Sequence, residues 1–290
     1  YRQLRAHMYT YTRDWDEFLA DIEGQAIGEA WGNDPCSITG DFDFTGTHTW
    51  DEAHTLLTHG WSEGRSKLAD STEFAKAVTR QGISEAWQHA PAGAFPNVPA
   101  YCAGIAECMM TPPGEEQRTS LPIVTVAVNV GAACFTPTEI MINRGAAIVA
   151  LVDSIEAQGQ RVELICCTRS ILHGNKGPLD IRVTVKRADE HVNLDRIAFT
   201  MAHPSMLRRM KFRIMEFTLP KKDWGYGTPT DFNVGDFEHG TMYIAKFSHS
   251  RFEQRDMYGT EEQAVQTVAD MWEAARTEWQ VANDELDEAV

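Results

Sequence analysis

The chain has 290 residues, 43% of them hydrophobic, and 8 are Trp; this composition is typical of a folded protein and excludes a disordered chain. Its 42 acidic residues against 26 basic ones give a formal net charge of −16. This excess disfavours broad nucleic-acid binding, which needs a concentrated basic face. No apolar run approaches the roughly 20 residues that span a bilayer, so no membrane partner is expected.

The six cysteines follow no CxxC spacing, which favours a reducing compartment and argues against structural zinc. Cys166 and Cys167 are adjacent in a predicted strand and must point to opposite faces. We therefore expect both to be small core residues.

The N-terminal part of the chain is predicted to be mainly helical. The apolar spacing indicates a helix over 14–31, and Thr49 with Glu52 forms a capping box that begins a second helix. Between them, residues 37–46 are interpreted as a short strand or turn. A further helix is expected over 72–87.

Residues 91–120 hold five prolines and three glycines, a composition that favours a loop or linker. This segment is the best candidate for a domain boundary. The sequence therefore predicts a mainly helical N-terminal region over 1–115 and an α/β domain over 116–290.

The clearest pattern in the chain is a βαβ unit over 121–168. A continuous apolar strand is expected over 121–130, followed by a helix with Thr136 as N-cap and Pro137 in its first turn. Gly159 is expected to end this helix in a left-handed conformation, and a second strand follows at once over 161–168.

The remaining elements follow in chain order. They are a half-exposed strand over 180–186, a helix capped by Asn193, a basic helical segment that begins at Pro204, a strand over 241–247, and a last long helix capped by Thr260 and Gln263.

The strands over 121–130, 161–168 and 180–186, with the helix over 136–158, resemble a von Willebrand factor A-type domain over about residues 121–217. The resemblance implies an α/β fold of three layers, with a mainly parallel, Rossmann-like sheet between helices. The mainly helical N-terminal region would be added to it.

Members of that family often bind a divalent metal above the first strand through an Asp-x-Ser-x-Ser loop, which supplies hard oxygen ligands. The matching positions here are Asn129, Gly131 and Ala133. Each departure removes a ligand or its charge, so the resemblance implies the fold while the residues predict a degenerate metal loop. We therefore assign no metal, cofactor or catalytic residue.

The whole chain is also similar to proteins encoded by bacterial viruses. The segments that carry this resemblance lie at 44–64, 96–109 and 144–164. It implies a location in the bacterial cytoplasm, or in association with a virion.

Asp41 and Asp43 form a DxD pair whose carboxylates would point to the same side of an extended segment, as shared metal coordination requires. The alternative is a solvated turn. Three other groups offer weaker chemistry. They are a histidine cluster without the spacing of a helical metal pair (His48, His54, His59), a cysteine before a helix that we expect to be buried against the sheet (Cys134), and a histidine between two helices that we interpret as a polar corner (His203).

One segment is basic in a chain that is otherwise acidic: residues 204–222 carry Arg208, Arg209, Lys211, Arg213, Lys221 and Lys222 against Glu216. Residues 253–290 carry eleven acidic residues against two arginines. The basic segment could be a solvated helix face, or it could bind the acidic tail of another copy.

These observations favour a non-enzymatic structural or protein-interaction function, with a partner that is a second copy or another viral or host protein. One alternative is a metal-dependent enzyme acting on nucleotides or nucleic acid through Asp41, Asp43 and His48. The other is RNA or single-stranded DNA binding through Arg208, Arg209, Lys211 and Arg213, with Trp224 and Tyr226 for stacking.

Overall fold

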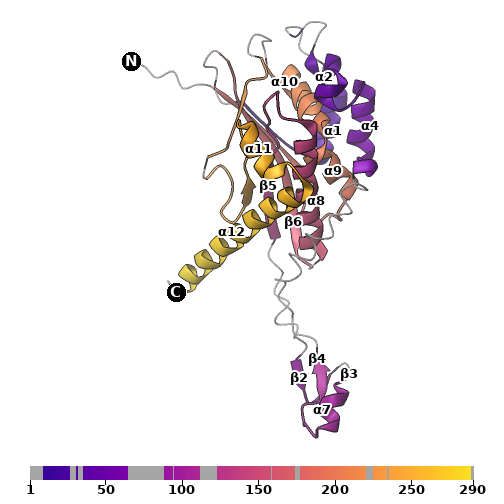
Figure 1. Cartoon of the computed structure of the whole chain (residues 1–290), viewed down its shortest axis with the longest axis vertical. Coiled ribbons are helices and arrows are strands. Elements are labelled where there is room, and N and C mark those ends of the chain that lie inside the picture. Colours follow the sequence, from indigo (N-terminus) through magenta and orange to yellow (C-terminus); the bar gives the residue numbers. More distant parts are fainter. Residues whose placement is uncertain are drawn as a thin grey trace.

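A computed structural model describes residues 9–26, 31, 35–64, 88–93, 95–111, 123–157, 159–173, 177–219, 225–233 and 235–288. The protein has an α/β fold around a mixed, mostly parallel six-stranded sheet in the order β1-β7-β6-β5-β9, with β8 paired to β6 (Figure 1). The strands are β1 (Tyr9–Asp14), β5 (Ile123–Asn129), β6 (Arg161–Ile171), β7 (Pro178–Lys186), β8 (Thr228–Thr230) and β9 (Met242–Ile244).

The helices differ in length, and the two longest of those described both follow β5. In chain order, the helices are α1 (Trp15–Gly24), α2 (Cys36–Thr39), α3 (Phe42–Thr45), α4 (Trp50–His59), α8 (Thr138–Ala157), α9 (Leu194–Ala202), the π-helical segment η3 (Met206–Lys211), α10 (Phe212–Thr218), α11 (Arg251–Tyr258) and α12 (Glu261–Glu288). Within the described residues, none of these helices combines the length and apolarity needed to cross a membrane.

The predicted βαβ unit is confirmed. Strands β5 and β6 pair in parallel and α8 connects them. Gly159 has φ +85°, the left-handed conformation expected after the helix. The helix begins at Thr138, so the prediction of Thr136 as its N-cap is wrong; the Thr136 hydroxyl instead accepts a hydrogen bond from Gln254 Nε2 at 3.1 Å. That threonine therefore ties the start of α8 to α11.

Strand β1 is an element that sequence reasoning missed. It lies at the edge of the sheet and pairs in parallel with β7, so the N-terminal segment is part of the main sheet. The alternation of Tyr and Thr over 9–12 is the strand signal that a helical interpretation of this region overlooked.

The strand or turn predicted over 37–46 is wrong as a strand, because this segment forms α2 and α3. Asp41 caps α3 by accepting a hydrogen bond from the backbone N–H of Phe44 at 2.9 Å. The Thr45 hydroxyl donates to the carbonyl of Asp41 at 2.7 Å. Local side-chain hydrogen bonds of this kind favour short helical turns over an extended chain.

Other capping predictions are confirmed. Thr49 accepts a hydrogen bond from the backbone N–H of Glu52 at the start of α4, and Asn193 accepts one from Arg196 at the start of α9. Thr260 and Gln263 form both hydrogen bonds of the capping box of α12. The first helix is shorter than predicted, and the helix expected over 72–87 lies outside the described residues.

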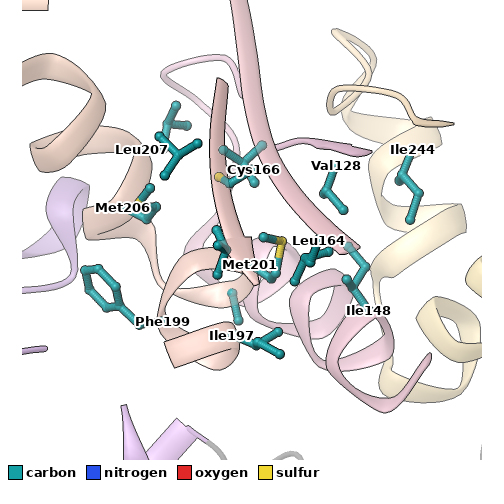
Figure 2. Packing of buried hydrophobic residues seen from close by; sticks show 14 of the residues in the cluster. Val128, Ile148, Leu164, Cys166, Ile197, Phe199, Met201, Met206, Leu207 and Ile244 are labelled. Atoms are coloured by element: carbon teal, nitrogen blue, oxygen red, sulfur yellow. The ribbon is translucent and has the colours of Figure 1, made fainter. Parts of the chain in front are cut away.

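The core runs through both halves of the chain. Val126, Ala127 and Val128 of β5 are all fully buried; since neighbouring strand residues point to opposite faces, both faces of the sheet are covered there. Figure 2 shows Val128 and Leu164 packed with residues of α8, α9 and η3. Phe18 and Leu57 belong to the same core cluster. A boundary at 115/116 therefore does not separate two cores.

A second, small sheet lies between the two halves in sequence. Strands β2 (Gln88–Ala90), β4 (Met109–Thr111) and β3 (Phe95–Pro96) form it in that order, with helix α7 (Val98–Cys102) between β3 and β4 (Figure 1). We refer to residues 88–111 as the small module.

Candidate functional site

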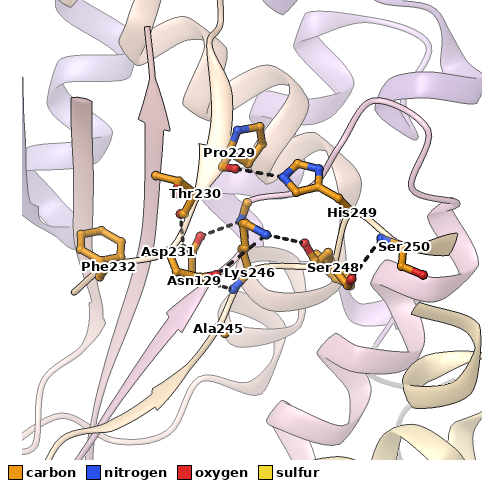
Figure 3. A network of polar contacts seen from close by, with 12 residues as sticks. Asn129, Pro229, Thr230, Asp231, Phe232, Ala245, Lys246, Ser248, His249 and Ser250 are labelled. Carbon is orange, nitrogen blue, oxygen red and sulfur yellow. Dashed lines mark hydrogen bonds and ion pairs between the residues drawn. The ribbon is translucent and has the colours of Figure 1, made fainter. Parts of the chain in front are cut away.

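The loop that the sequence analysis compared with a metal loop begins at Asn129, the last residue of β5, and the Asn129 side chain forms three hydrogen bonds there (Figure 3). Its amide nitrogen donates to the carbonyl of Thr230 and to the hydroxyl of Tyr243, both at 3.0 Å. Its amide oxygen accepts from the backbone N–H of Gly131 at 3.0 Å. Asn129 therefore joins β5 to the segments around β8 and β9.

The residues of this loop do not fit a divalent metal. Asn129 carries no charge and uses its amide oxygen within the loop, and neither Gly131 nor Ala133 has a side-chain oxygen. A Cβ at Gly131 would lie 2.9 Å from the Asn129 amide oxygen, so the close loop leaves little room for a side chain there. The donor set is that of a structural hydrogen-bond network.

The Asp41 and Asp43 pair does not have the predicted extended geometry. Asp41 caps α3 and Asp43 lies in its first turn, both exposed, while the ring of His48 stacks on Phe42 at a centroid distance of 4.3 Å. His54 is 3.5 Å from Glu23, and His59 bonds within its own helix. In the part of the chain that the structure describes, no three His, Cys, Asp or Glu residues gather as metal ligands would.

Most of the basic segment lies inside the protein, which corrects its interpretation as a solvated face. The side chains of Arg208, Arg209 and Lys211 are all buried. Arg213 is half-buried and donates to the carbonyl of Gln25 at 2.8 Å. Lys221 and Lys222 lie outside the described residues, as does Trp224.

Arg209 attaches the N-terminal helices to the α/β body. Its guanidinium donates to Thr47 Oγ1 at 2.7 Å, and its other hydrogen bonds go to backbone carbonyls. These are the carbonyls of Ser37 at 2.8 Å, Ile38 at 3.1 Å, Gly40 at 2.9 Å and Thr47 at 2.9 Å. Arg209 is a structural residue, so a surface contact with a partner is not available to it.

Arg208 and Lys211 line a cavity of 430 Å³ at the carboxyl end of β5. Arg208 donates to the carbonyls of Phe44 at 2.7 Å and Thr136 at 2.8 Å. Lys211 Nζ donates to Ser170 Oγ at 2.7 Å, and its burial lowers the pKa of the amine to about 7. Sequence reasoning singled out both residues but not this cavity.

The three cysteines singled out in the sequence differ in burial. Cys134 is exposed, so its expected burial against the sheet is wrong, and it lies on the wall of the same cavity. Cys166 and Cys167 are buried as predicted, and burial raises the pKa of both thiols, for Cys166 to about 12.

His203 is the buried polar corner that the sequence predicted. Its Nδ1 accepts a hydrogen bond from the backbone N–H of Ser205 at 3.1 Å, and its ring contacts Trp61 and Phe199. Burial lowers its pKa from 6.5 to about 4. The folded protein therefore holds the neutral imidazole.

This depressed pKa gives a testable pH dependence. The unfolded chain binds a proton at His203 below 6.5 while the folded chain does not until about 4, so stability falls over that window as pH falls. We expect this residue to account for about 2 kcal/mol of lost unfolding free energy between about pH 7.5 and about pH 5. Urea denaturation of wild type and His203→Asn, which keeps an acceptor for Ser205, measures it. An equally steep loss in the variant would contradict the assignment.

The small module exposes large apolar side chains. Val98, Tyr101 and Ile105 are 60%, 70% and 52% exposed, and residues 95–106 contain no charged residue. Of the module's side chains that the structure describes, only Ala100 is buried. An uncharged apolar surface of this kind is characteristic of a site of association.

Comparison with known proteins gives one match. A family model described as a domain of unknown function, DUF7192, matches residues 2–281. No curated protein and no solved structure matches the chain.

Proposed function

The chain belongs to the DUF7192 family, and we propose that it is a non-enzymatic protein-interaction protein that self-associates. We further propose that its α/β body is a von Willebrand A-like domain without a metal site, in a virus-encoded protein. The exposed apolar surface of the small module is the observation that carries the proposal of self-association.

The sheet topology supports the proposed three-layer body. If β8, which pairs with β6 off the main path, is left out, the strands from β5 onward have the spatial order 3-2-1-4, because β7, β6, β5 and β9 are neighbours in that order. This is the order of doubly wound, Rossmann-like sheets, here with the third strand antiparallel. The degenerate loop after β5 favours binding over metal chemistry.

A second copy is the partner that fits the module best. A short three-stranded sheet buries little apolar surface by itself and needs cover from another surface. The absence of charge over 95–106 lets two copies approach there although each carries a net charge of −16. Most oligomers of soluble proteins are formed by identical chains.

The side chains of Arg208, Arg209 and Lys211 are buried, and this changes how we expect self-association to depend on salt concentration. A contact between a basic face and an acidic tail would weaken as salt screens the attraction. An apolar contact between two acidic chains strengthens instead, because salt screens their repulsion.

We expect sedimentation velocity on a concentration series to show a dimer or larger species, favoured at high salt. Replacing Val98, Tyr101 and Ile105 together with Ser should give a monomer. The control is Phe252→Ser, which removes an 83% exposed apolar side chain from α11 and should associate like wild type. A wild-type monomer at every concentration and salt, or association unchanged by the triple substitution, would refute the proposal.

A further inference from the structure

The cavity beside Arg208 and Lys211 lies at the carboxyl end of β5, a strand with neighbours on both sides. From β5 the chain moves to β6 and β7 on one side, and it later returns to place β9 on the other side. Because β5 and β9 are parallel, the loops that follow them lie at the same edge of the sheet, and open α/β sheets bind ligands at the carboxyl ends of their strands.

Both of these loops line the cavity. Ala132, Ala133 and Cys134 come from the loop after β5, and His249 comes from the segment after β9. The π-helical segment η3 forms another wall, a conformation that is rare and frequently occurs at functional sites. The volume of 430 Å³ is that of a small-molecule site.

The charged Arg and Lys side chains that line the cavity are of one sign. No Asp or Glu lines it, and neither Arg208 nor Lys211 forms an ion pair with an acidic residue that the structure describes. The hydrogen bonds of Arg208 go to two carbonyls, and that of Lys211 goes to the Ser170 hydroxyl. Buried cations with only neutral partners are costly, and an anion would offset that cost.

The remaining walls are aromatic. The rings of Phe212 and Tyr226 stack at a centroid distance of 3.9 Å, and Phe44 lies 6.2 Å from Phe212. The guanidinium of Arg208 lies 4.4 Å above the ring of Phe44. A ligand with a flat apolar body would be covered by these rings while its charged group faces the two cations.

We propose that this cavity binds a small organic anion, a carboxylate or phosphate on a flat apolar body, with its anionic group at Lys211 and Arg208. This site is independent of the small module and does not rest on the proposed self-association.

The site predicts proton-linked binding. The titratable group that interacts with the Lys211 amine is Cys166 of β6. Arg208, Cys36, Cys134, Tyr226 and His249 line the cavity, and behind its wall the buried Glu216 of α10 accepts a hydrogen bond from the Tyr226 hydroxyl. A bound anion favours the charged amine, so above about pH 7 binding takes up a proton. Affinity then falls by up to about tenfold per pH unit as pH rises.

Calorimetry with benzoate, phenyl phosphate, inorganic phosphate and the neutral benzamide tests this site in the full chain. We expect benzoate or phenyl phosphate to bind at least about tenfold more tightly than benzamide. The difference in affinity between benzoate and phenyl phosphate distinguishes a carboxylate site from a phosphate site. Preference for inorganic phosphate over both aromatic anions would overturn the flat-body requirement. Equal binding of benzamide, or no anion binding, would overturn the site.

Lys211→Met should lower the affinity for the preferred anion at least about tenfold and should remove the proton uptake. Met occupies a similar volume without a buried charge, so we expect the variant to stay folded. His249→Gln should keep the proton uptake, and Arg187→Met, which removes an exposed charge outside the cavity, should bind like wild type. If Lys211→Met does not fold, calorimetry of the wild type in buffers of different ionisation enthalpy measures the protons taken up on binding. Binding of the anion without proton uptake above about pH 7 would contradict the proposal.

Discussion

Arg209→Met is expected to destabilise the protein by about 4 kcal/mol, and to release the N-terminal helices first. The substitution removes every hydrogen bond from the guanidinium to Thr47 Oγ1 and to the four backbone carbonyls of residues 37–47. An acceptor left buried without a donor costs about 1–3 kcal/mol, and water entering the opened segment offsets part of the total.

Denaturant unfolding measures the loss, and hydrogen exchange locates it. Amides of α2 and α3 should exchange faster in the variant than in wild type, with β5 less affected. Arg187→Met is the matched control, because Arg187 is exposed and should change stability by less than about 0.5 kcal/mol. An Arg209→Met protein as stable as the control would mean that this arginine does not hold residues 37–47.

Gly145→Ala is the second large effect that the structure predicts. A Cβ at Gly145 would lie 2.2 Å from the Cα of Ala202, so α8 and α9 would have to separate. Overpacking of this kind costs about 1–3 kcal/mol, and a backbone contact is at the upper end since no side chain can rotate away. Alanine regains up to about 1 kcal/mol in helix propensity, which leaves a net loss of roughly 2 kcal/mol.

The matched control is Gly24→Ala at the end of α1. A Cβ there meets nothing within 4 Å, so this substitution should be neutral or slightly stabilising. Thermal unfolding of the two variants beside wild type separates helix propensity from close packing. A Gly145→Ala protein that melts with or above the Gly24→Ala protein would contradict the observed approach of α8 and α9.

The elements that the sequence predicted well are those with local signals. The start of α4 and the end of α8 follow from Thr49 and Gly159, and the parallel pairing of β5 with β6 follows from the helical crossover α8 that connects them. Residues 37–46, expected to be a short strand or turn, show the limit of such signals. Their alternating pattern is also compatible with α2 and α3, which are attached to Arg209 from far along the chain.

The candidate site could be predicted only in part. The residues of the loop after β5 were identified from the sequence, and Arg208 and Lys211 stood out as basic residues in an acidic chain. Their burial could not be predicted, because the acceptors of Arg208, the carbonyls of Phe44 and Thr136, are 164 and 72 residues away in sequence. The cavity likewise forms only where these distant segments meet.

We expect the carboxyl end of the sheet to function without a metal, because the side chain of Asn129 serves as a structural cross-link there. Titration of the purified protein with Mn²⁺, followed by electron paramagnetic resonance, tests it most directly. We predict that the free-ion signal stays proportional to added Mn²⁺ at millimolar concentrations, with no difference between wild type and Asp43→Ala. Stoichiometric uptake of one Mn²⁺ that is lost in Asn129→Ala or in Asp43→Ala would contradict the account.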